Sequence, residues 1–394
     1  MLFHMGRNLL LLTTNEGIKM KIAMLGWEYP PFKVGGLGTH CYGLTKGLAK
    51  KGVDIDFYMP KTKQKIQSIH KKIKIIEVGI TTVFPYDRPG ETASGDKFFE
   101  SVNKYNKLLV QKVKGKYDLI HGHDWLTMNA GIQLKQKLRL PLVFTIHSTE
   151  YDRSGWFQPN QWFIDIEKDG MKQADELIAV SELTKRVIVK KYEISSKKVQ
   201  VIHNAVYPLG SGKKQKIVLF LGRLTIQKGP EFFLKTAKRV LELERDVKFV
   251  IAGDGEMLPR LIDEAMEMGI ANKIMFTGKL TEDEVKHIYR IASIYVMPSV
   301  SEPFGITALE AISAGTPTVV SKVSGVSEVF RNCFKVDYWD IDKTTNIIIA
   351  LLRYPSLQET IVENGSQEIK LFTWDRVAER TLAQYHHIVE RSLQ

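Results

Sequence analysis

Cysteine is scarce in this chain of 394 residues, which contains only Cys41 and Cys333. Two thiols this far apart give neither the dense pattern of a disulfide-stabilised secreted domain nor the paired spacing of a structural zinc site. The sequence therefore excludes a fold that depends on a disulfide framework.

Long apolar runs are also missing. No stretch approaches the roughly 18 to 20 apolar residues that a membrane-spanning helix needs. Residues 1–19 hold a short leucine run at 9–12 but lack the longer apolar segment and the cleavage site of a signal peptide. We predict a cytoplasmic protein with an N-terminal extension at 1–19 and a first domain that begins at Met20.

Acidic residues are too few to balance the basic ones: the chain has 56 Lys and Arg residues but only 44 Asp and Glu residues, which gives a net charge of +12. A basic chain favours an anionic partner such as a nucleotide, a nucleic acid or an acidic lipid. The lysine-rich segment 61–75 is the most basic part, and we interpret it as a solvated face that leads into a strand, with contact to anionic lipid as the alternative. No nucleic-acid-binding motif accompanies the charge, so we expect no nucleic-acid partner.

Short apolar runs alternate with segments of helical periodicity along the chain. This alternation predicts an α/β protein with two parallel sheets, each covered by helices on both faces. The predicted strands lie at 21–26, 53–60, 117–123, 141–147, 176–181 and 199–205, and then at 217–222, 247–253, 273–278, 293–299 and 316–321.

A small polar stretch, PLGSGKK at 208–214, separates the two series of strands and has the composition of a linker. We therefore predict one domain at 20–209, a second at 210–373, and a final helical segment at 374–394. Two doubly wound domains in tandem place the carboxyl ends of both sheets beside a shared cleft, where ligands of such folds bind.

The stretch SEPFGITALEA at 301–311 joins a predicted strand to a predicted helix. Pro303 disfavours helix at Glu302, so Glu302 precedes the helix and Glu310 lies within it. The first helical turn offers unpaired backbone N–H groups to a phosphate, while a carboxylate accepts hydrogen bonds from hydroxyls. This order fits a sugar on Glu302, a diphosphate, and a ribose on Glu310, although two ordinary acids along a helix are the alternative. The predicted donor-binding turn comprises Phe304, Gly305, Ile306 and Thr307.

Two loops that follow strands of the second series supply further groups. GRLTIQKGP places Arg223 and Lys228 where fixed cations would stabilise the charge of a departing diphosphate, with a solvated surface loop as the alternative. In AGDGE, Gly253 and Gly255 permit close approach of a donor or a simple tight turn. The loop lacks the third glycine of the dinucleotide fingerprint, which argues against a nicotinamide cofactor.

In the first domain, KVGGLGTH at 33–40 follows the first strand and precedes a helix. Gly35 and Gly36 permit a phosphate to approach the backbone, and Lys33 could reach the same phosphate. The segment lacks the ending of a Walker loop, so kinase-type ATP chemistry is disfavoured.

Taken in order, KVGGLG, HGHDW at 121–125, TIH at 145–147, GRLTIQKG and SEPFGITALE resemble the motifs of retaining nucleotide-sugar glycosyltransferases, the family that includes glycogen and starch synthases. The resemblance covers nearly the whole chain from Met20. It implies a GT-B fold of two facing Rossmann-like domains, with the final helix crossing back onto the first. It also implies transfer of a hexose, with glucose expected, from a UDP- or ADP-sugar to a glucan or other glycan hydroxyl, without a cofactor or a metal.

The resemblance also implies roles for individual residues. Arg223 and Lys228 match the family's diphosphate-binding pair, and Glu302 and Glu310 match its two acids. His147 matches a histidine near the anomeric carbon, so the implied catalytic residues are His147, Arg223, Lys228 and Glu302.

Further positions complete the comparison. Lys33 and Gly36 match the glycine loop beneath the donor phosphates, and Asp124 and Trp125 match a pair that shapes the acceptor side. A helix cap and a packed aromatic are the alternative for that pair, as a core histidine is for His147. Ala205 departs from the family's asparagine-glycine pair, which leaves the role of Asn204 open.

Several features keep other interpretations open. The two DID triplets at 54–56 and 340–342 mimic the metal-binding acids of the other major glycosyltransferase fold, but their predicted positions lead us to assign neither a metal. The aromatic segment 150–163 is expected to pack, with sugar stacking or membrane contact as alternatives. The alternative functions are a peripheral-membrane glycosyltransferase acting on a lipid-linked or cell-envelope glycan, and a nucleotide-sugar epimerase or non-catalytic nucleotide-binding protein.

Overall fold

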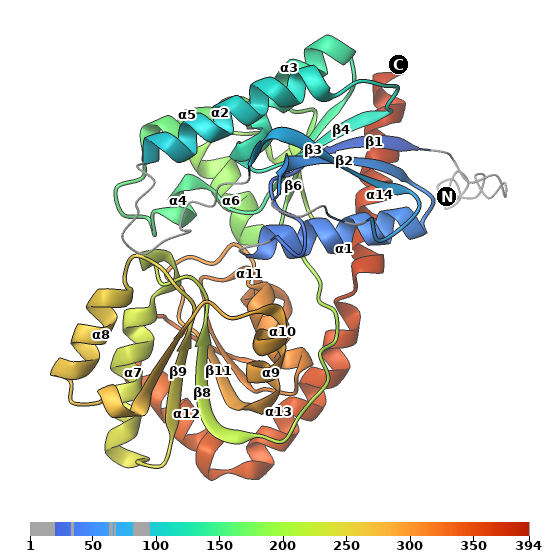
Figure 1. The fold of residues 1–394 in the computed structure, drawn as a ribbon. Helices are drawn as coiled ribbons and strands as arrows, with labels where there is room; N and C mark the ends of the chain where they lie inside the picture. Colours follow the sequence, from blue (N-terminus) through green and yellow to red (C-terminus); the bar gives the residue numbers. More distant parts are fainter. Residues whose placement is uncertain (1–19, 33–34, 63–65, 67, 82–94, 394) are drawn as a thin grey trace, which may run out of the picture.

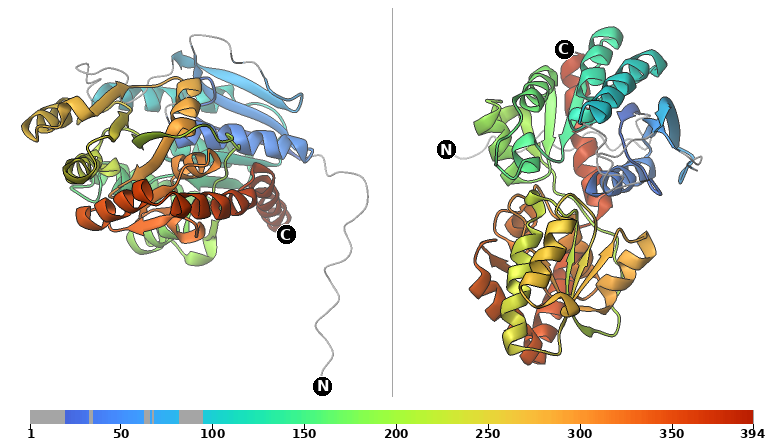
Figure 2. Two further views of the ribbon diagram at one scale, coloured as in Figure 1. Left: turned by 90° about the horizontal axis from the view of Figure 1, so that it is seen from below. Right: turned by 60° about the vertical axis from the view of Figure 1, so that its left-hand side comes forward.

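The computed structural model describes residues 20–32, 35–62, 66, 68–81 and 95–393. In these residues the chain forms two lobes, one above the other in Figure 1, each built around its own sheet. Figure 2 shows the same two lobes from other directions. The N-terminal extension 1–19 and Lys33 lie outside the described residues.

The first lobe contains a parallel sheet with the strand order β3-β2-β1-β4-β5-β6-β7. Its inner strands are largely apolar runs buried on both faces, as in β5, where all five residues are buried. The strands are β1 Lys21–Leu25, β2 Asp54–Lys61, β3 Ile73–Thr81, β4 Leu119–His123, β5 Leu142–Ile146, β6 Glu176–Ala179 and β7 Val199–Val201. The helices are α1 Gly36–Lys50, α2 Gly95–Lys112, α3 Trp125–Leu138, α4 Glu150–Arg153, α5 Gln161–Gln173 and α6 Glu182–Lys191.

The second lobe repeats this arrangement with the order β10-β9-β8-β11-β12-β13, again parallel. The strands are β8 Gln215–Leu221, β9 Lys248–Ala252, β10 Ile274–Gly278, β11 Ala292–Met297, β12 Thr318–Ser321 and β13 Phe334–Val336. The helices are α7 Pro230–Leu243, α8 Leu258–Glu267, α9 Glu282–Ile291, α10 Ile306–Ser313, α11 Gly325–Val329, α12 Ile341–Arg353 and α13 Pro355–Glu368. Short 3-10 turns include η1 Ser196–Lys198, η2 Ile226–Lys228, η3 Ala271–Lys273 and η4 Ile369–Leu371.

In both sheets the strand order reverses beside the first strand, between β1 and β4 and between β8 and β11. Ligands of doubly wound folds bind at the carboxyl ends of strands flanking such a reversal. The loops after β1, β4, β8 and β11 carry the motifs singled out in the sequence. The prediction of two parallel sheets is therefore confirmed, and so are the eleven predicted strands.

Two edge strands complete the sheets. The lysine-rich segment leads into β3, as expected, and its Lys72 pairs with Asp54 of β2 at 3.1 Å; residues 63–65 and 67 of that segment lie outside the described residues. The other edge strand, β13, is not among the predicted strands, because its three residues carry too little periodicity to be recognised.

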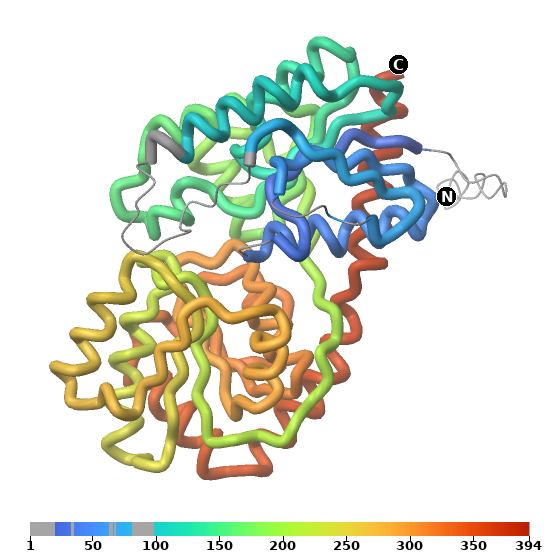
Figure 3. The backbone as a smooth tube through the Cα atoms, viewed as in Figure 1, coloured from blue at the N-terminus to red at the C-terminus, as the bar shows by residue number. Residues whose placement is uncertain are grey.

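The final helix, α14 Trp374–Ser392, leaves the second lobe and packs on the first, as the red helix in Figures 1 and 3 shows. Its buried residues Trp374, Ala378 and Tyr385 join the same apolar cluster as Ile22 of β1 and Phe57 of β2. The segment that leads into α14 lies beside the connection from β7 to β8, because Val206 N donates to Phe372 O at 3.2 Å. None of the helices in the described part of the chain combines the length and the apolar composition of a bilayer span.

Candidate active site

The loop after β11 leads into α10 through Gly305, which adopts a left-handed conformation with φ of 101°. A Cβ at this position would lie 2.9 Å from Met297 Cε, so glycine relieves both strain and crowding. No side chain caps α10. The backbone N–H groups of its first turn, at Ile306 and Thr307, are thus positioned to bind an anion.

Glu302 and Lys228 form an ion pair with an Nζ–Oε2 distance of 2.6 Å. Glu302 precedes α10, while Lys228 lies in η2 after β8, so the pair joins two neighbouring loops. Ser299 Oγ also donates to Glu302 at 3.3 Å. Only 7% of Glu302 is exposed, and this low exposure strengthens its attraction to the lysine.

Arg223 lies in the same pair of loops. Its Nη2 donates to Gln227 Oε1 at 3.2 Å, and the backbone oxygen of Gln227 accepts from Val300 N at 2.9 Å. The structure thus brings Arg223, Lys228 and Glu302 to one edge of the second sheet.

Glu310 stands one and a half turns into α10 and is half-buried. Burial raises the pKa of Tyr295 on β11, and the charges of Glu302 and Glu310 add to that effect. Both carboxylates therefore lie near one tyrosine of the central strand β11. Phe304, in the turn before α10, is buried in the core beneath them.

Gly253 and Gly255 have φ angles of 138° and 157°. A Cβ would lie 1.9 Å from Gly222 O at the first position and 2.4 Å from Leu224 O at the second. Both positions therefore require glycine, because the loop after β8 leaves no room for a side chain. The predicted contact of these glycines with a donor stays a prediction.

Asp124 stands at the N-terminal end of α3, but its carboxylate does not cap that helix. Its Oδ1 accepts instead from His147 N at 2.6 Å, which ties the end of β4 to the end of β5. Asp124 is therefore the N-cap residue of α3 by position, as one interpretation of the sequence had it, but its carboxylate bonds the residue after β5 and makes no cap hydrogen bond to α3. Burial raises the pKa of Asp124 to about 7.

Trp125 is buried and packs edge-on against Phe163 with a centroid distance of 4.9 Å. This is the packed aromatic that the sequence allowed. In the segment 150–163, packing holds for Phe163 but is wrong for Phe157, which is 65% exposed. Trp156 is also exposed, and its Nε1 donates to Ser301 Oγ of the second lobe at 3.4 Å.

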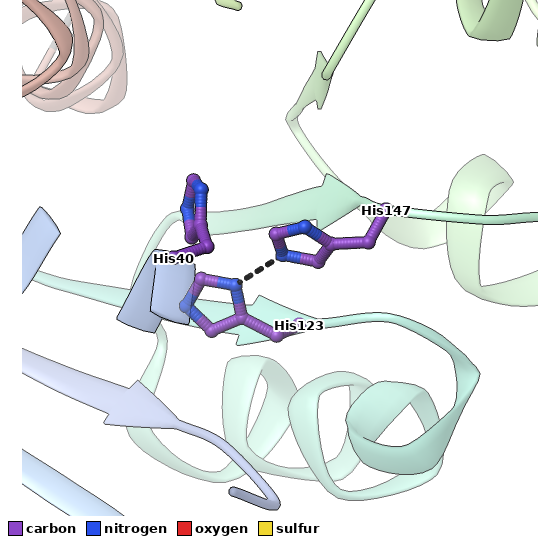
Figure 4. Close-up of side chains that lie close together, drawn as sticks. All are labelled: His40, His123 and His147. Atoms are coloured by element: carbon purple, nitrogen blue, oxygen red, sulfur yellow. Dashed lines mark hydrogen bonds between the residues drawn. The ribbon is translucent and has the colours of Figure 1, made fainter. Parts of the chain in front are cut away.

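His147 follows β5 and lies partly exposed beside two buried histidines. Its Nε2 is 3.1 Å from His123 Nδ1, and its ring centroid is 4.4 Å from that of His40 (Figure 4). Burial lowers the pKa of His147 well below the ordinary value, so the ring is neutral at physiological pH. His40 stands at the end of the GGLGTH motif, but its place beside His147 could not be read from the sequence because contact depends on the fold.

The start of α1 faces the start of α10. Gly35 is the N-cap residue of α1, which has no side-chain cap either. A Cβ on Gly36 would lie 3.5 Å from Ile306 Cδ1. Two uncapped helix N-termini, one from each lobe, therefore approach each other next to the Lys228–Glu302 pair.

Further contacts between the lobes were not foreseen in the sequence. Ser301 Oγ donates to Asp152 Oδ1 of α4 at 2.7 Å. Glu328 of α11 accepts from the backbone N–H groups of Glu182 and Leu183 at the start of α6, at 2.9 and 2.6 Å. Isolated acids of this kind carry no local motif, so only the fold identifies them.

The aspartates of the two DID triplets have other partners. Asp54 pairs with Lys72 at 3.1 Å, and Asp56 pairs with Lys21 at 3.0 Å. Asp340 caps α12 through Lys343 N at 3.0 Å, and Asp342 lies 3.3 Å from Arg239.

Two family models match the chain in succession. The model described as Glycosyltransferase Family 4 matches residues 34–208, and the model described as Glycosyl transferases group 1 matches residues 204–368. The two matches meet in the connection between the lobes.

Curated relatives extend over most of the chain. A glycosyltransferase of Methanocaldococcus jannaschii is 34% identical over 396 residues, which cover 94% of this chain and 99% of the relative. A glycogen synthase of Mycobacterium tuberculosis is 29% identical over 334 residues, which cover 79% of this chain and 80% of the relative.

Solved structures share the fold. Sucrose-phosphate synthase from Thermosynechococcus elongatus has a TM-score of 0.80 at 21% identity and covers 95% of this chain and 100% of its own. The catalytic domain of starch synthase IV from Arabidopsis thaliana, bound to ADP and acarbose, has a TM-score of 0.71 at 18% identity and covers 94% and 100%. The chain described here folds into two facing lobes, matches two family models in succession and aligns with a relative over nearly its full length. It therefore belongs to the glycosyltransferases of the GT-B fold, with family 4 and group 1 domains.

Proposed function

We propose that this glycosyltransferase transfers a hexose, with glucose as the expected sugar, from a UDP- or ADP-sugar to a hydroxyl of a glucan, with retention of the anomeric configuration. The observation that carries the proposal is the meeting of two uncapped helix N-termini, at Gly36 and Ile306, beside the Lys228–Glu302 ion pair. This arrangement offers N–H groups and a cation to a diphosphate, and a carboxylate to the sugar next to it.

In this proposal the diphosphate lies between the starts of α1 and α10. Lys228 and Arg223 stabilise the negative charge that grows on the diphosphate as it leaves. Glu302 accepts hydrogen bonds from hydroxyls of the transferred sugar, and Glu310 accepts them from the ribose. Lys33 and the loop residues Phe304, Thr307, Gly35, Gly253 and Gly255 are proposed to complete the donor site.

The proposed transfer breaks the bond between the anomeric carbon and a diphosphate oxygen, and forms a bond from the acceptor oxygen on the same face of the sugar. The acceptor proton passes to the departing diphosphate. We propose that His147 stands beside the anomeric carbon, held by the hydrogen bond from its backbone N–H to Asp124. Asp124 is then a positioning residue on the acceptor side, with Trp125 packed behind it. The proposed chemistry requires no metal and no cofactor.

The glycogen synthase relative supports the choice of a glucan acceptor, and the starch synthase bound to ADP and acarbose shows that a protein of this fold binds a nucleotide. The test is to incubate the chain with UDP-, ADP- and GDP-sugars, with and without glucan primers, and to follow release of the nucleotide. We expect primer-dependent release with a UDP- or ADP-sugar. No release from any donor by the folded protein would overturn the proposal.

A substitution separates a transferase from a nucleotide-binding protein. Glu302→Gln should lower turnover by about 100-fold or more, because it removes the charge next to the sugar, and should leave nucleotide affinity nearly unchanged. The matched control is Glu363→Gln, an exposed position on α13, which should change neither quantity. Salt-sensitive binding to anionic liposomes without glucan elongation would favour a lipid-linked acceptor instead.

A further inference from the structure

Three histidines from separate elements of the first lobe point toward one another in Figure 4. His40 lies in α1, His123 ends β4, and His147 follows β5. One ring nitrogen from each lies within 4.8 Å of those of the other two. Their positions, far apart in the sequence, have none of the short spacings by which a metal site is recognised.

The hydrogen bonds of His40 fix which of its nitrogens carries the proton. Its Nδ1 is 2.6 Å from Asn204 Oδ1, an acceptor, so Nδ1–H donates and Nε2 bears a lone pair. That Nε2 is buried without a hydrogen-bond partner. A side-chain oxygen that receives the second N–H of a histidine is also the arrangement that orients histidine ligands in metal sites.

His123 and His147 share one hydrogen bond, with 3.1 Å between Nδ1 and Nε2. Zinc bound by two imidazoles at its usual distance in a tetrahedral site separates their nitrogens by about 3.3 Å. An ion could therefore take the place of this hydrogen bond after a modest rotation of the two rings, once the ring that carries the shared proton has moved it to its other nitrogen. Bringing in the third nitrogen would take a shift of at most about 1.5 Å, within the reach of side-chain rotation.

The three rings meet largely out of contact with solvent, because His40 and His123 are buried and His147 is only partly exposed. A fourth histidine, His121, lies with its ring centroid 4.5 Å from that of His123, but both of its ring nitrogens are occupied, by Tyr385 and Thr145.

We propose that His40, His123 and His147 form a binding site for a divalent transition-metal ion of the zinc class, with Asn204 orienting His40. Imidazole nitrogen is a preferred ligand of zinc, copper and nickel, and three protein ligands leave one position of a tetrahedral ion open. The filled site is inhibitory. This consequence rests on the proposed function, in which His147 stands beside the transferred sugar and must be free of an ion.

The experiment uses the full chain, stripped with a chelator and titrated with Co²⁺ while its visible absorption is recorded. We expect one ion per chain with the spectrum of four-coordinate Co²⁺, displaced by Zn²⁺. His147→Ala and His40→Gln should each weaken binding by at least about 100-fold, and Asn204→Ala by about 10- to 100-fold. His287→Ala, at an exposed position on α9, is the matched control and should bind as the unmodified chain does.

Absence of saturable binding, or binding that survives both His147→Ala and His40→Gln, would overturn the site. Circular dichroism checks that each variant is folded. If His40→Gln does not fold, the test relies on His147→Ala, because His147 is partly exposed. In the assay of nucleotide release, one equivalent of Zn²⁺ should abolish turnover and a chelator should restore it. Binding without loss of turnover overturns the inhibitory role, whereas no turnover in the metal-free chain counts against the proposed function and leaves the metal titration valid.

Discussion

At the level of single residues, the ion pair between Lys228 and Glu302 joins two groups that have separate roles in the proposed transfer. Glu302 is nearly fully buried, and the lysine 2.6 Å away offsets the cost of burying its charge. The ammonium group of Lys228 has three N–H donors, so it can contact a bound diphosphate while it stays paired with Glu302. The pair therefore holds both groups near their proposed working positions before a donor arrives.

Lys228→Ala is expected to lower kcat/KM by about 100- to 1000-fold, because it removes a cation from the charge that develops on the leaving diphosphate. Steady-state kinetics with the active donor measure this effect. Lys235→Ala, an exposed lysine on the adjacent helix α7, is the control and should leave kcat/KM unchanged. Equal activity of the two variants would remove Lys228 from the mechanism.

Asp124 gives a pH dependence whose sign follows from its burial, which raises its pKa from 3.8 to about 7 in the folded protein. The folded state therefore binds the proton more tightly than the unfolded chain does. The resulting stabilisation is present below pH 3.8 and is lost as the pH rises to about 7. The buried histidines act in the opposite direction, because their lowered pKa values make protonation destabilising as the pH falls.

Asp124→Asn isolates this contribution, since asparagine can still accept from His147 N but cannot ionise. The difference in free energy of unfolding between Asp124→Asn and the unmodified chain should grow in favour of the variant between pH 4 and 7, by about 4 kcal/mol at most. Urea unfolding at a series of pH values measures it. A difference that does not vary with pH would show that Asp124 titrates normally.

At the level of secondary-structure elements, the docking of α14 on α1 depends on two glycines. A Cβ on Gly43 would lie 2.1 Å from the Trp374 ring, and one on Gly47 would lie 2.8 Å from Trp374 O. Glycine usually weakens a helix interior, but here it lets two helix backbones approach closely. This packing holds the final helix against the first lobe.

Gly47→Ala should therefore destabilise the protein by about 1–3 kcal/mol, because the backbone oxygen of Trp374 cannot move away without displacing α14. The higher helix propensity of alanine offsets only part of this cost. Urea unfolding gives the free energy, and Lys51→Ala, exposed at the end of α1, serves as the control. An increase in stability would mean that α14 adjusts freely.

At the level of the whole molecule, a few polar contacts join the two lobes. The Glu328 carboxylate reaches the N-terminus of α6, where Arg186 also approaches it at 3.2 Å. Ser301 and Asp152 form a second contact between the lobes. The proposed donor site takes groups from both lobes and is complete only when they lie together, so these contacts influence how easily the chain opens to admit a donor.

Glu328→Gln removes the charge that favours the N-terminus of α6, a contribution of about 0.3–1 kcal/mol. We expect a larger radius of gyration in small-angle X-ray scattering and a higher KM for the donor, with kcat less affected. Glu359→Gln, exposed on α13, is the control. An unchanged radius and KM would show that other contacts set the closed arrangement.

Local pattern was enough to predict much of this molecule. Periodicity placed the interior strands of both sheets and the helix α14 at the observed residues, and Pro303 with Gly305 placed Glu302 before α10. Order along the chain placed Arg223, Lys228 and Glu302 at one sheet edge, because parallel strands bring their following loops together. The three-residue strand β13 was too short to give such a pattern.

The sequence by itself therefore determined most of the strands, their parallel arrangement and the family, since these depend on residues close together in the chain or on ordered motifs. The tertiary structure alone decided that the Asp124 carboxylate binds His147 N, that Glu328 reaches α6, and that His40, His123 and His147 converge. Each of these contacts joins residues from different elements. Their distances depend on how strands and helices are packed in space, which no local spacing records.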